Sequence, residues 1–170
     1  MDRRRFLTFF AACASMALAP LDAEIAEKAT TPTRAPGCKV FTLQQAATVE
    51  AFCEQIVPSD DYPGAKTAGV LYFIDHALAD PLARFRPRYD EGLELVNRIS
   101  QKKFGDVPSG ISSSQQIALL QALESGEAAG RTGQELFSMI RRHTMQGYYG
   151  DPQLGGNRGG LSWKMLNFSR

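Results

Sequence analysis

The feature that most constrains the fold is the recurrence of apolar residues at every third or fourth position along most of the chain. The clearest example runs through Val70, Phe73, Ile74, Ala77 and Leu78. This spacing places apolar side chains on one face of an α-helix, and no segment shows the alternating pattern of a β-strand. We therefore predict a mainly α-helical fold, an irregular orthogonal bundle of about five helices followed by a glycine-rich, aromatic C-terminal tail.

Capping residues and helix breakers give the limits of the first two helices. Thr42 and Gln45 form a capping box at the start of the first helix, in which each side chain bonds the backbone of the other residue. Pro58 ends that helix, because proline cannot continue the helical hydrogen bonds. The second helix is expected between Gly69 and Pro81.

Three further helices are expected downstream. Pro87 can start the third, and Gly92 on its apolar face predicts the close approach of another backbone. The fourth helix is indicated by a capping box of Ser112 with Gln115 or of Ser113 with Gln116, an apolar face of Ile117, Leu120 and Leu123, and a stop at Gly126. The fifth helix is indicated by a capping box of Thr132 with Glu135 and a face of Leu136, Met139, Ile140, His143 and Gly147.

The length and charge of the chain limit its domains and its partners. The 170 residues include 19 basic and 18 acidic side chains, which gives a net charge of +1. A chain of this length forms a single domain with a sizeable core. The balanced charge, with no basic and aromatic patch beyond the N-terminus, predicts no nucleic-acid partner.

The N-terminus carries the pattern of an export signal. Arg3 and Arg4, with Phe6 and Leu7 after one free position, are similar to the twin-arginine motif. The apolar run over residues 6–19 is too short to span a bilayer as a helix, which takes about 20 residues. We therefore predict a twin-arginine signal over residues 1–23, the twin-arginine translocase as a partner, and a periplasmic location.

The residues that follow the apolar run separate the signal from the domain. Cleavage after Ala19 would place Pro20 at the cut, so a later site, such as that after Ala23, is an equal alternative. Residues 24–40 are rich in Ala, Thr and Pro without an apolar period, which predicts a flexible leader. Residues 41–170 then form the single helical domain.

The C-terminal tail has an unusual composition. Residues 147–160 contain six glycines, which allow left-handed backbone and close approach, so we expect no regular helix there. Tyr148, Tyr149, Trp163 and Phe168 add large aromatic surfaces, which need either the core of this chain or another protein.

No pattern in the sequence predicts catalysis. His143 falls in the middle of an apolar helix face, so we expect a hydrogen-bonded core or interface histidine. Cys53 lies on a buried stripe, where its thiol would be inert. Asp60 and Asp61, like Asp151 before its proline, are typical of turns. We expect no catalytic residue, no metal site and no cofactor in this chain.

An internal disulfide between Cys38 and Cys53 is disfavoured by distance. If the first helix starts near Thr42, Cys53 lies about 16 Å along its axis, whereas the four residues back to Cys38 span at most about 14 Å. The Cα atoms of a disulfide lie about 6 Å apart, so this bond requires the leader to double back along the helix. We expect Cys38 to be free or bonded to another subunit.

Two blocks of the sequence, in this order, resemble the gluconate 2-dehydrogenase subunit 3 family over nearly the whole mature chain. The first block has Ile56-Val57-Pro58, Pro63-Gly64-Ala65, Gly69-Val70 and Phe73-Ile74-Asp75. The second block has Gly147-Tyr148-Tyr149, Asp151-Pro152, Gly155-Gly156-Asn157 and Trp163-Lys164. The chain is short after Trp163, which leaves the last contacts of the family pattern open.

The resemblance implies a non-catalytic small subunit of a periplasmic complex, associated with the cytoplasmic membrane through that complex. The implied partners are an FAD-containing large subunit of the glucose-methanol-choline type, which oxidises a sugar or sugar acid, and a multihaem cytochrome c subunit carrying haem c. The small subunit of this family is thought to aid the folding, twin-arginine export and stability of the large subunit. Cys38 is the candidate for an intersubunit disulfide.

The tail and the loop over residues 60–69 are expected to form much of the contact with the large subunit, because such a role needs an apolar and aromatic docking surface. The candidate interface residues are Asp60, Pro63, Gly64, Tyr148, Tyr149, Asp151, Pro152, Gly155, Gly156, Asn157 and Trp163.

Two alternatives compete with this hypothesis. The first is a freestanding periplasmic helical protein that binds a small ligand in a pocket near the glycine-rich tail. The second is an enzyme that uses His143 and Asp151 as an acid–base pair. Recovery as a lone, stable monomer would favour the first alternative, and turnover by the isolated chain is required for the second.

Overall fold

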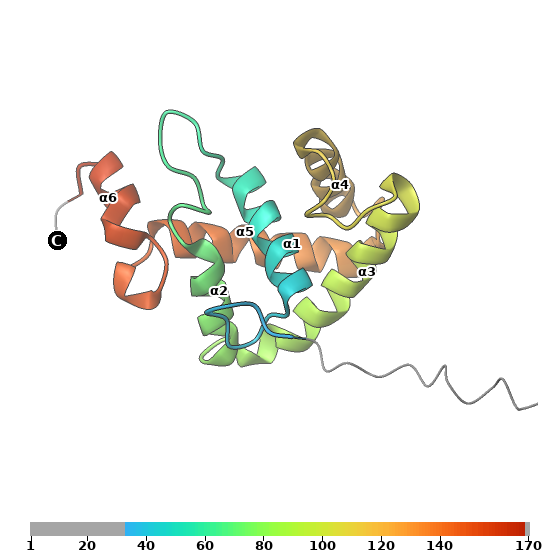
Figure 1. The fold of residues 1–170 in the computed structure, drawn as a ribbon, viewed down its shortest axis with the longest axis horizontal. Coiled ribbons are helices and arrows are strands. Elements are labelled where there is room, and N and C mark those ends of the chain that lie inside the picture. The colour runs from blue at the N-terminus through green and yellow to red at the C-terminus, as the bar shows by residue number, and fades with distance from the viewer. Residues whose placement is uncertain (1–32, 169–170) are drawn as a thin grey trace, which may run out of the picture. The chain divides into compact units, whose positions relative to one another are not determined.

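The computed structural model describes residues 33–168, which belong to one compact unit (Figure 1). The predicted signal, including Arg3, Arg4, Phe6 and Leu7, lies outside the described residues. The helices are α1 (Leu43–Ile56), α2 (Val70–Ala79), α3 (Arg86–Phe104), α4 (Ser113–Ser125), α5 (Gly130–Tyr149) and α6 (Leu161–Met165), with short 3-10 turns at Ala83–Phe85, Pro152–Leu154 and Arg158–Gly160. The described residues contain no β-strand, only an isolated bridge between Arg34 and Thr42.

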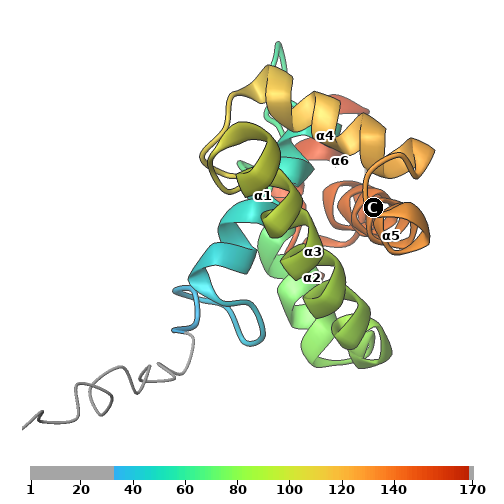
Figure 2. The same ribbon diagram turned by 90° about the vertical axis from the view of Figure 1, so that its right-hand side faces the viewer.

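The longest helix, α5, lies at the centre of the bundle and contacts each of α1, α2, α3 and α4. Figure 2 looks nearly along the axis of α5, whereas α3 and α4 run across the view, so the helices cross at steep angles. This arrangement confirms the predicted mainly α-helical fold. α6 lies beyond the C-terminal end of α5, away from α3 and α4 (Figure 1).

The buried face of α5 determines how closely the other helices approach. Leu136 and Ile140 are fully buried on this face. A Cβ on Gly92 of α3 would lie 3.0 Å from the Cβ of Leu136, which is closer than ordinary packing allows. The absence of a side chain at Gly92 therefore brings α3 against α5, as the sequence predicted.

The predicted helix signals for α1 and α4 are confirmed in detail. The Thr42 hydroxyl accepts a hydrogen bond from the Gln45 amide, and the Gln45 side chain accepts one from the Thr42 amide. At α4 the structure selects Ser112 with Gln115, rather than the next pair along the chain, as the capping box. Gly126 ends α4 with a left-handed φ of 80°.

One residue assigned to the buried face of α4 is exposed. Ile117 was predicted to be buried, but 44% of its surface is accessible to solvent. Gln116 is buried instead, because its side-chain amide donates hydrogen bonds to the carbonyls of Pro108 and Ile111 and accepts one from Gln55. The buried face of α4 therefore includes Gln116 in place of the predicted Ile117.

The limits of α5 differ from the prediction at both ends. The helix begins at Gly130, before the expected cap at Thr132, because the turn from α4 closes when the Ala128 amide donates to the carbonyl of Ala122. It also continues through Gly147 to Tyr149, where a glycine-rich tail without helix was expected. A Cβ on Gly147 would lie 2.8 Å from the ring of Phe73, so this glycine allows α2 to pack against an intact helix.

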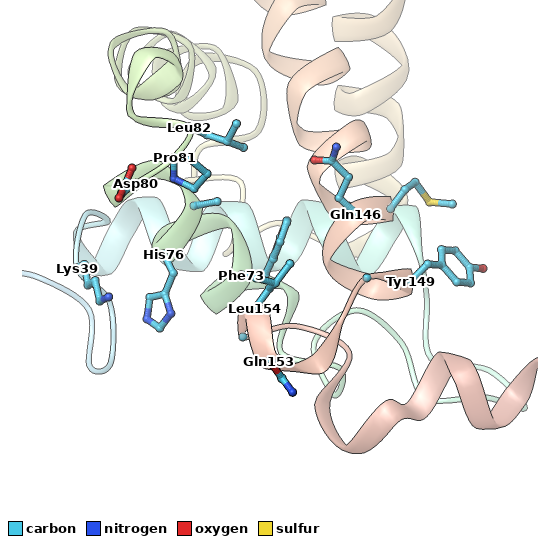
Figure 3. A pocket seen from close by; sticks show the side chains of 14 residues that line it. Lys39, Phe73, His76, Asp80, Pro81, Leu82, Gln146, Tyr149, Gln153 and Leu154 are labelled. Carbon is cyan, nitrogen blue, oxygen red and sulfur yellow. The ribbon is translucent and has the colours of Figure 1, made fainter. Parts of the chain in front are cut away.

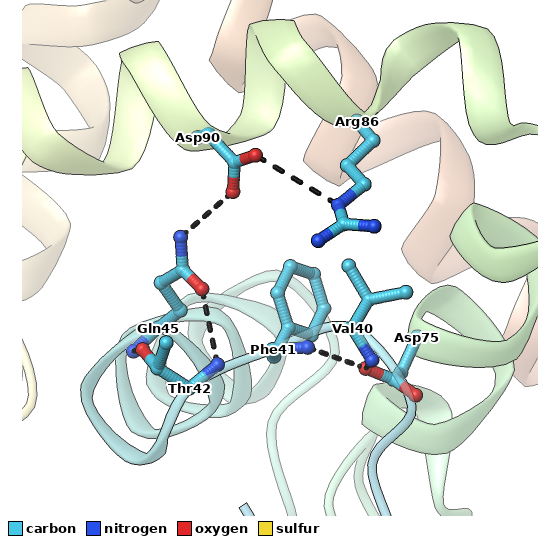
Figure 4. Close-up of polar contacts among 7 residues, drawn as sticks. All are labelled: Val40, Phe41, Thr42, Gln45, Asp75, Arg86 and Asp90. Atoms are coloured by element: carbon cyan, nitrogen blue, oxygen red, sulfur yellow. Dashed lines mark hydrogen bonds and ion pairs between the residues drawn. The ribbon is translucent and has the colours of Figure 1, made fainter. Parts of the chain in front are cut away.

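The N-terminal segment, residues 33–41, packs against the bundle. Phe41 is fully buried and Val40 nearly so, so the fold begins before the predicted boundary at residue 41, and the predicted flexible leader does not extend to residue 40. The carboxylate of Asp75 explains the difference, since it accepts hydrogen bonds from the amides of Val40 and Phe41 at 2.9 and 2.8 Å (Figure 4). It also accepts one from the Lys39 amide.

Side-chain bonds between helices reinforce this corner of the fold. Gln45, which caps α1, also donates to the carboxylate of Asp90 on α3 at 2.8 Å (Figure 4). Arg86 lies 3.9 Å from the same carboxylate. The start of α1 is thereby tied to the start of α3.

Candidate docking surface

The C-terminal segment, residues 150–168, is held in shape by one asparagine. Asn157 is fully buried and adopts a left-handed φ of 43°. Its side-chain amide donates to the carbonyl of Gly150 at 2.9 Å, and its side-chain oxygen accepts from the Ser162 amide at 2.9 Å. A Cβ on Gly156 would lie 2.2 Å from the carbonyl oxygen of Gly147, so the segment returns directly onto the last turn of α5.

The two regions predicted to form the interface lie in contact with each other. The Tyr148 hydroxyl donates to the carbonyl of Pro63 at 2.6 Å, and the Arg158 amide donates to the carbonyl of Ala68 at 3.1 Å. The Arg158 guanidinium lies 4.5 Å from the centre of the Tyr72 ring. A Cβ on Gly69, whose φ is 73°, would lie 2.4 Å from the Arg158 side chain. The loop and the C-terminal segment therefore form one surface.

The loop over residues 57–69 is ordered by the carboxylate of Glu54. This carboxylate accepts hydrogen bonds from the Ser59 amide and hydroxyl and from the Lys66 amide. Asp60 accepts from the Tyr62 amide at 2.9 Å, the turn geometry that the sequence predicted. As a result, Tyr62 is presented on the outside of a fixed loop.

An apolar groove of about 830 Å³ lies beside the C-terminal segment (Figure 3). Leu154 is 59% exposed there, Met145 42% and Tyr149 39%. Lys39 and His76 lie at the end of the groove away from Tyr149 (Figure 3). The groove is lined by apolar side chains from α2, the turn after α2, α5 and the C-terminal segment, chiefly Phe73, Ala77, Pro81, Leu82, Met145 and Leu154.

The short helix α6 carries a second apolar surface. The Trp163 indole donates to the carbonyl of Tyr149 at 2.9 Å, and its ring meets that of Phe168 edge-on with 5.3 Å between centres. Leu166 and Phe168 are more than half exposed. Apolar side chains that cluster on a surface mark sites of interaction with other molecules, whereas single exposed ones are common.

The candidate interface residues divide by their exposure. Asp60, Pro63 and Tyr149 are exposed; Asp151, Pro152, Gly155 and Trp163 are half-buried; Gly64, Tyr148, Gly156 and Asn157 are buried inside this chain. The side chains of Tyr148 and Asn157 therefore position the surface from beneath. The sequence reasoning missed Met145 and Leu154, because exposure of an apolar residue on a helix or turn leaves no periodic signal.

His143 is a core histidine, as predicted. It is 3% exposed, and its Nδ1 lies 2.9 Å from the Tyr89 hydroxyl. Burial, together with the charge of Arg142, lowers the pKa of His143, and burial raises the pKa of Tyr89. Both groups are therefore neutral near pH 7. Asp151, its partner in the enzyme alternative, caps the turn that follows and accepts from the Gln153 amide at 3.0 Å.

Both cysteines in the described part of the chain are free thiols. Burial raises the pKa of Cys53 to about 12, and the Thr144 hydroxyl donates to its sulfur. Partial burial and the nearby carboxylate of Asp75 raise the pKa of Cys38 to about 11. Because the thiolate is the reactive form, a disulfide from Cys38 to another subunit would form slowly at neutral pH.

A model of the gluconate 2-dehydrogenase subunit 3 family matches residues 43–169. The chain belongs to this family. Comparison with curated proteins and with solved structures gave no match. The matched range contains the loop, the whole C-terminal segment and every residue that lines the apolar groove except Lys39, so the surface belongs almost entirely to the subunit 3 domain.

Membership of the subunit 3 family is consistent with a small, accessory subunit of a multisubunit dehydrogenase complex. Within residues 33–168, no cluster of three or more His, Cys, Asp or Glu side chains is placed to hold a metal ion. In the same part of the chain, none of the helices has the length and apolar character needed to cross a bilayer.

Proposed function

We propose that this chain is the non-catalytic small subunit of a periplasmic, FAD-dependent dehydrogenase complex and that it binds the large flavoprotein subunit through the surface around the C-terminal segment. The observation that carries this proposal is that the apolar groove, the loop and α6 lie together on one subunit 3 domain. A surface of this kind suits a stable partner, because burying apolar side chains drives most protein association.

The buried polar groups of the bundle favour a structural role over a catalytic one. His143 is hydrogen-bonded to Tyr89, and Asp75 is occupied by three backbone amides. Both groups are enclosed by the core rather than open to a substrate. In the proposed complex FAD belongs to the large subunit, and haem c belongs to a cytochrome subunit that receives the electrons.

We further propose that the chain aids folding and export of the large subunit through the twin-arginine route. The support is the pattern of Arg3, Arg4, Phe6 and Leu7, together with the export of folded, cofactor-loaded proteins by that route. A flavoprotein that lacks its own signal would travel with this chain. The complex would then remain associated with the cytoplasmic membrane.

Co-purification tests the docking surface. The tagged full chain is expressed with its FAD-containing large subunit, and the amount of bound flavoprotein is measured from flavin absorbance. Met145→Asp with Leu154→Asp should reduce the bound flavoprotein about tenfold or more, because charged groups would be buried in the interface.

Two other exposed apolar residues provide a matched control. Leu43 and Ile117 are 53% and 44% exposed and lie outside the groove. Leu43→Asp with Ile117→Asp adds the same charge and should leave the bound flavoprotein within about twofold. Equal losses in both double variants, or no binding by the unaltered chain, would refute the proposal.

Export is tested separately. Arg3→Lys with Arg4→Lys keeps the charge but removes the arginine pair, so the large subunit should accumulate in the cytoplasmic fraction. Immunoblots of cytoplasmic and periplasmic fractions measure the outcome. A large subunit that still reaches the periplasm would show that it does not depend on this signal.

The size of the apolar groove also favours a second candidate, a freestanding ligand-binding protein. Its volume of about 830 Å³ lies within the usual range of small-molecule sites, about 300–1,000 Å³, and it combines an apolar lining with a few polar groups. Recovery of the chain as a stable monomer, with no flavoprotein bound under any salt condition, would favour this candidate.

A further inference from the structure

The central helix α5 exposes one line of side chains along its whole length. Arg131, Ser138, Arg142, Met145 and Tyr149 are exposed and recur at steps of three, four or seven residues, so they follow one side of the helix. The character of this line changes along the helix. It is cationic and polar in the first part and apolar in the last two turns, which lead to the C-terminal segment (Figure 1).

Three hollows adjoin this line and share lining residues. A hollow of about 360 Å³ lies towards Phe85 and Arg88 of the neighbouring turn and α3, and a second of about 630 Å³ lies towards Ile56 of α1. Ser138 and Arg142 line both hollows. Met145 lines the second hollow and also the apolar groove, so the three hollows follow one another along the exposed line, and together they are here named the α5 track.

The cationic part of the α5 track has an excess of positive charge. Four arginines line its two hollows, namely Arg88, Arg131, Arg141 and Arg142, against a single carboxylate, Glu135, which is paired with Arg131 at 2.9 Å. In the described part of the chain, no carboxylate lies within 4.0 Å of the other three guanidinium groups. This local excess contrasts with a net charge of only +1 for the whole chain.

We propose that the α5 track binds a protein segment of the large subunit that is acidic over most of its length and apolar at one end. The inference rests on the proposed function, since it takes the segment to belong to that subunit. Carboxylates of the segment pair with the arginines, and its apolar end enters the groove beside Leu154. Guanidinium groups suit this role because they bind carboxylates with two parallel hydrogen bonds.

The length of the track limits the size of the segment. Arg131 and Tyr149 are separated by 18 residues of helix, or about 27 Å at 1.5 Å per residue. That distance matches roughly eight residues of extended chain or about five turns of a helix. A hollowed track also fits a chain segment better than it fits a flat membrane surface.

The test reverses the charge of the track in the full chain. Arg141→Glu with Arg142→Glu is co-expressed with the large subunit, and the dissociation constant of the isolated complex is measured at several salt concentrations. We expect affinity at low salt to fall about tenfold or more and the salt dependence to become shallower, because steering between opposite charges is lost.

Lys102 and Lys103 provide a matched control pair. They are adjacent, exposed and helical, and Lys103 lies over a phenylalanine ring, as Arg141 does. They lie near the end of α3 and line neither of the two cationic hollows of the α5 track. Lys102→Glu with Lys103→Glu should leave the dissociation constant within about twofold. Circular dichroism establishes that both double variants are folded.

Each outcome distinguishes the inference from the proposed function. If the unaltered chain binds the large subunit and both double variants bind equally well, the α5 track inference fails while the proposed function stands. If the unaltered chain does not bind, both fail. If only the arginine variant loses sedimentation with phosphatidylglycerol vesicles while its affinity for the large subunit is unchanged, the track faces lipid and the inference is overturned.

Discussion

The helical body, residues 43–149, and the C-terminal segment are stabilised in different ways. The body is held by fully buried apolar side chains, such as Leu136 and Ile140 on α5. The segment buries few large side chains, and its shape depends on Asn157, on close backbone contacts and on the bond from Trp163 to Tyr149. The body should therefore unfold as a unit, whereas the segment should open with only a few bonds lost.

This difference separates stability from binding. In the body, a substitution changes the free energy of unfolding in proportion to the apolar volume removed. In the segment, a substitution should change the surface offered to a partner while the helices stay folded.

The largest effect is expected for Ile140→Ala in the body. Ile140 is fully buried, so the free energy of unfolding should fall by roughly 2–5 kcal/mol, because the residue leaves a cavity in the core. Urea denaturation followed by circular dichroism measures the change. Ile117→Ala, on the exposed face of α4, should change it by no more than about 0.5 kcal/mol. Similar losses at both positions would contradict the assignment of the core.

A smaller and local effect is expected for Asn157→Ala in the segment. The substitution removes the hydrogen bonds to Gly150 and Ser162, so opening of the segment should become easier by about 1–3 kcal/mol. Hydrogen exchange should accelerate at the amides of α6 and remain unchanged in α5. Asn157→Gly, which accommodates the left-handed backbone, should have the same effect if the side-chain bonds are responsible.

The junction between body and segment is tested by Gly69→Ala. Alanine would have to adopt the left-handed φ of Gly69, and its Cβ would clash with the Arg158 side chain. The free energy of unfolding should therefore fall by about 1–2 kcal/mol. In the double variant with Arg158→Ala, the part of the cost that arises from this contact should disappear. Additive losses, measured by urea denaturation, would show that Arg158 does not pack against Gly69.

The smallest effect concerns the pH dependence of the body. Because the pKa of His143 is lowered in the folded state, the unfolded chain takes up a proton more readily as the pH falls below about 6.5. Stability should therefore decrease from pH 7 to pH 5, by less than the limit of about 1.4 kcal/mol per pH unit for one proton. His143→Gln should flatten this dependence, as measured by urea denaturation between pH 5 and pH 7.

The sequence predicted the body well because its helices depend on local and periodic signals. These signals act between residues a few positions apart or along one helix face. Examples are the capping box of Thr42 and Gln45, the end of α4 at Gly126 and the small residue Gly92 on α3. The end of α5 was predicted less well. Gly147 disfavours a helix by propensity, but its contact with Phe73 of α2 requires a glycine within the helix.

The docking surface was predicted only in part, because much of it depends on contacts between distant residues. The tail and the loop were singled out together, and the structure joins them through Tyr148 and Pro63. The exposure of Met145 and Leu154 could not be predicted, since it depends on which neighbouring elements cover each position. The role of Asp75 had one signal in the sequence, since it is the single carboxylate in the mainly apolar α2.

The bonds from Asp75 to the N-terminal segment have a mechanical consequence. Tension applied to the chain upstream of residue 33 would first load the bonds from the Leu43 amide to the Thr33 carbonyl and from the Ala35 amide to the Phe41 carbonyl. The bonds that Asp75 accepts from residues 39–41 lie behind this pairing. Asp75 therefore gives the N-terminal segment a second anchorage on α2, so a pull on this segment would be shared between α1 and α2.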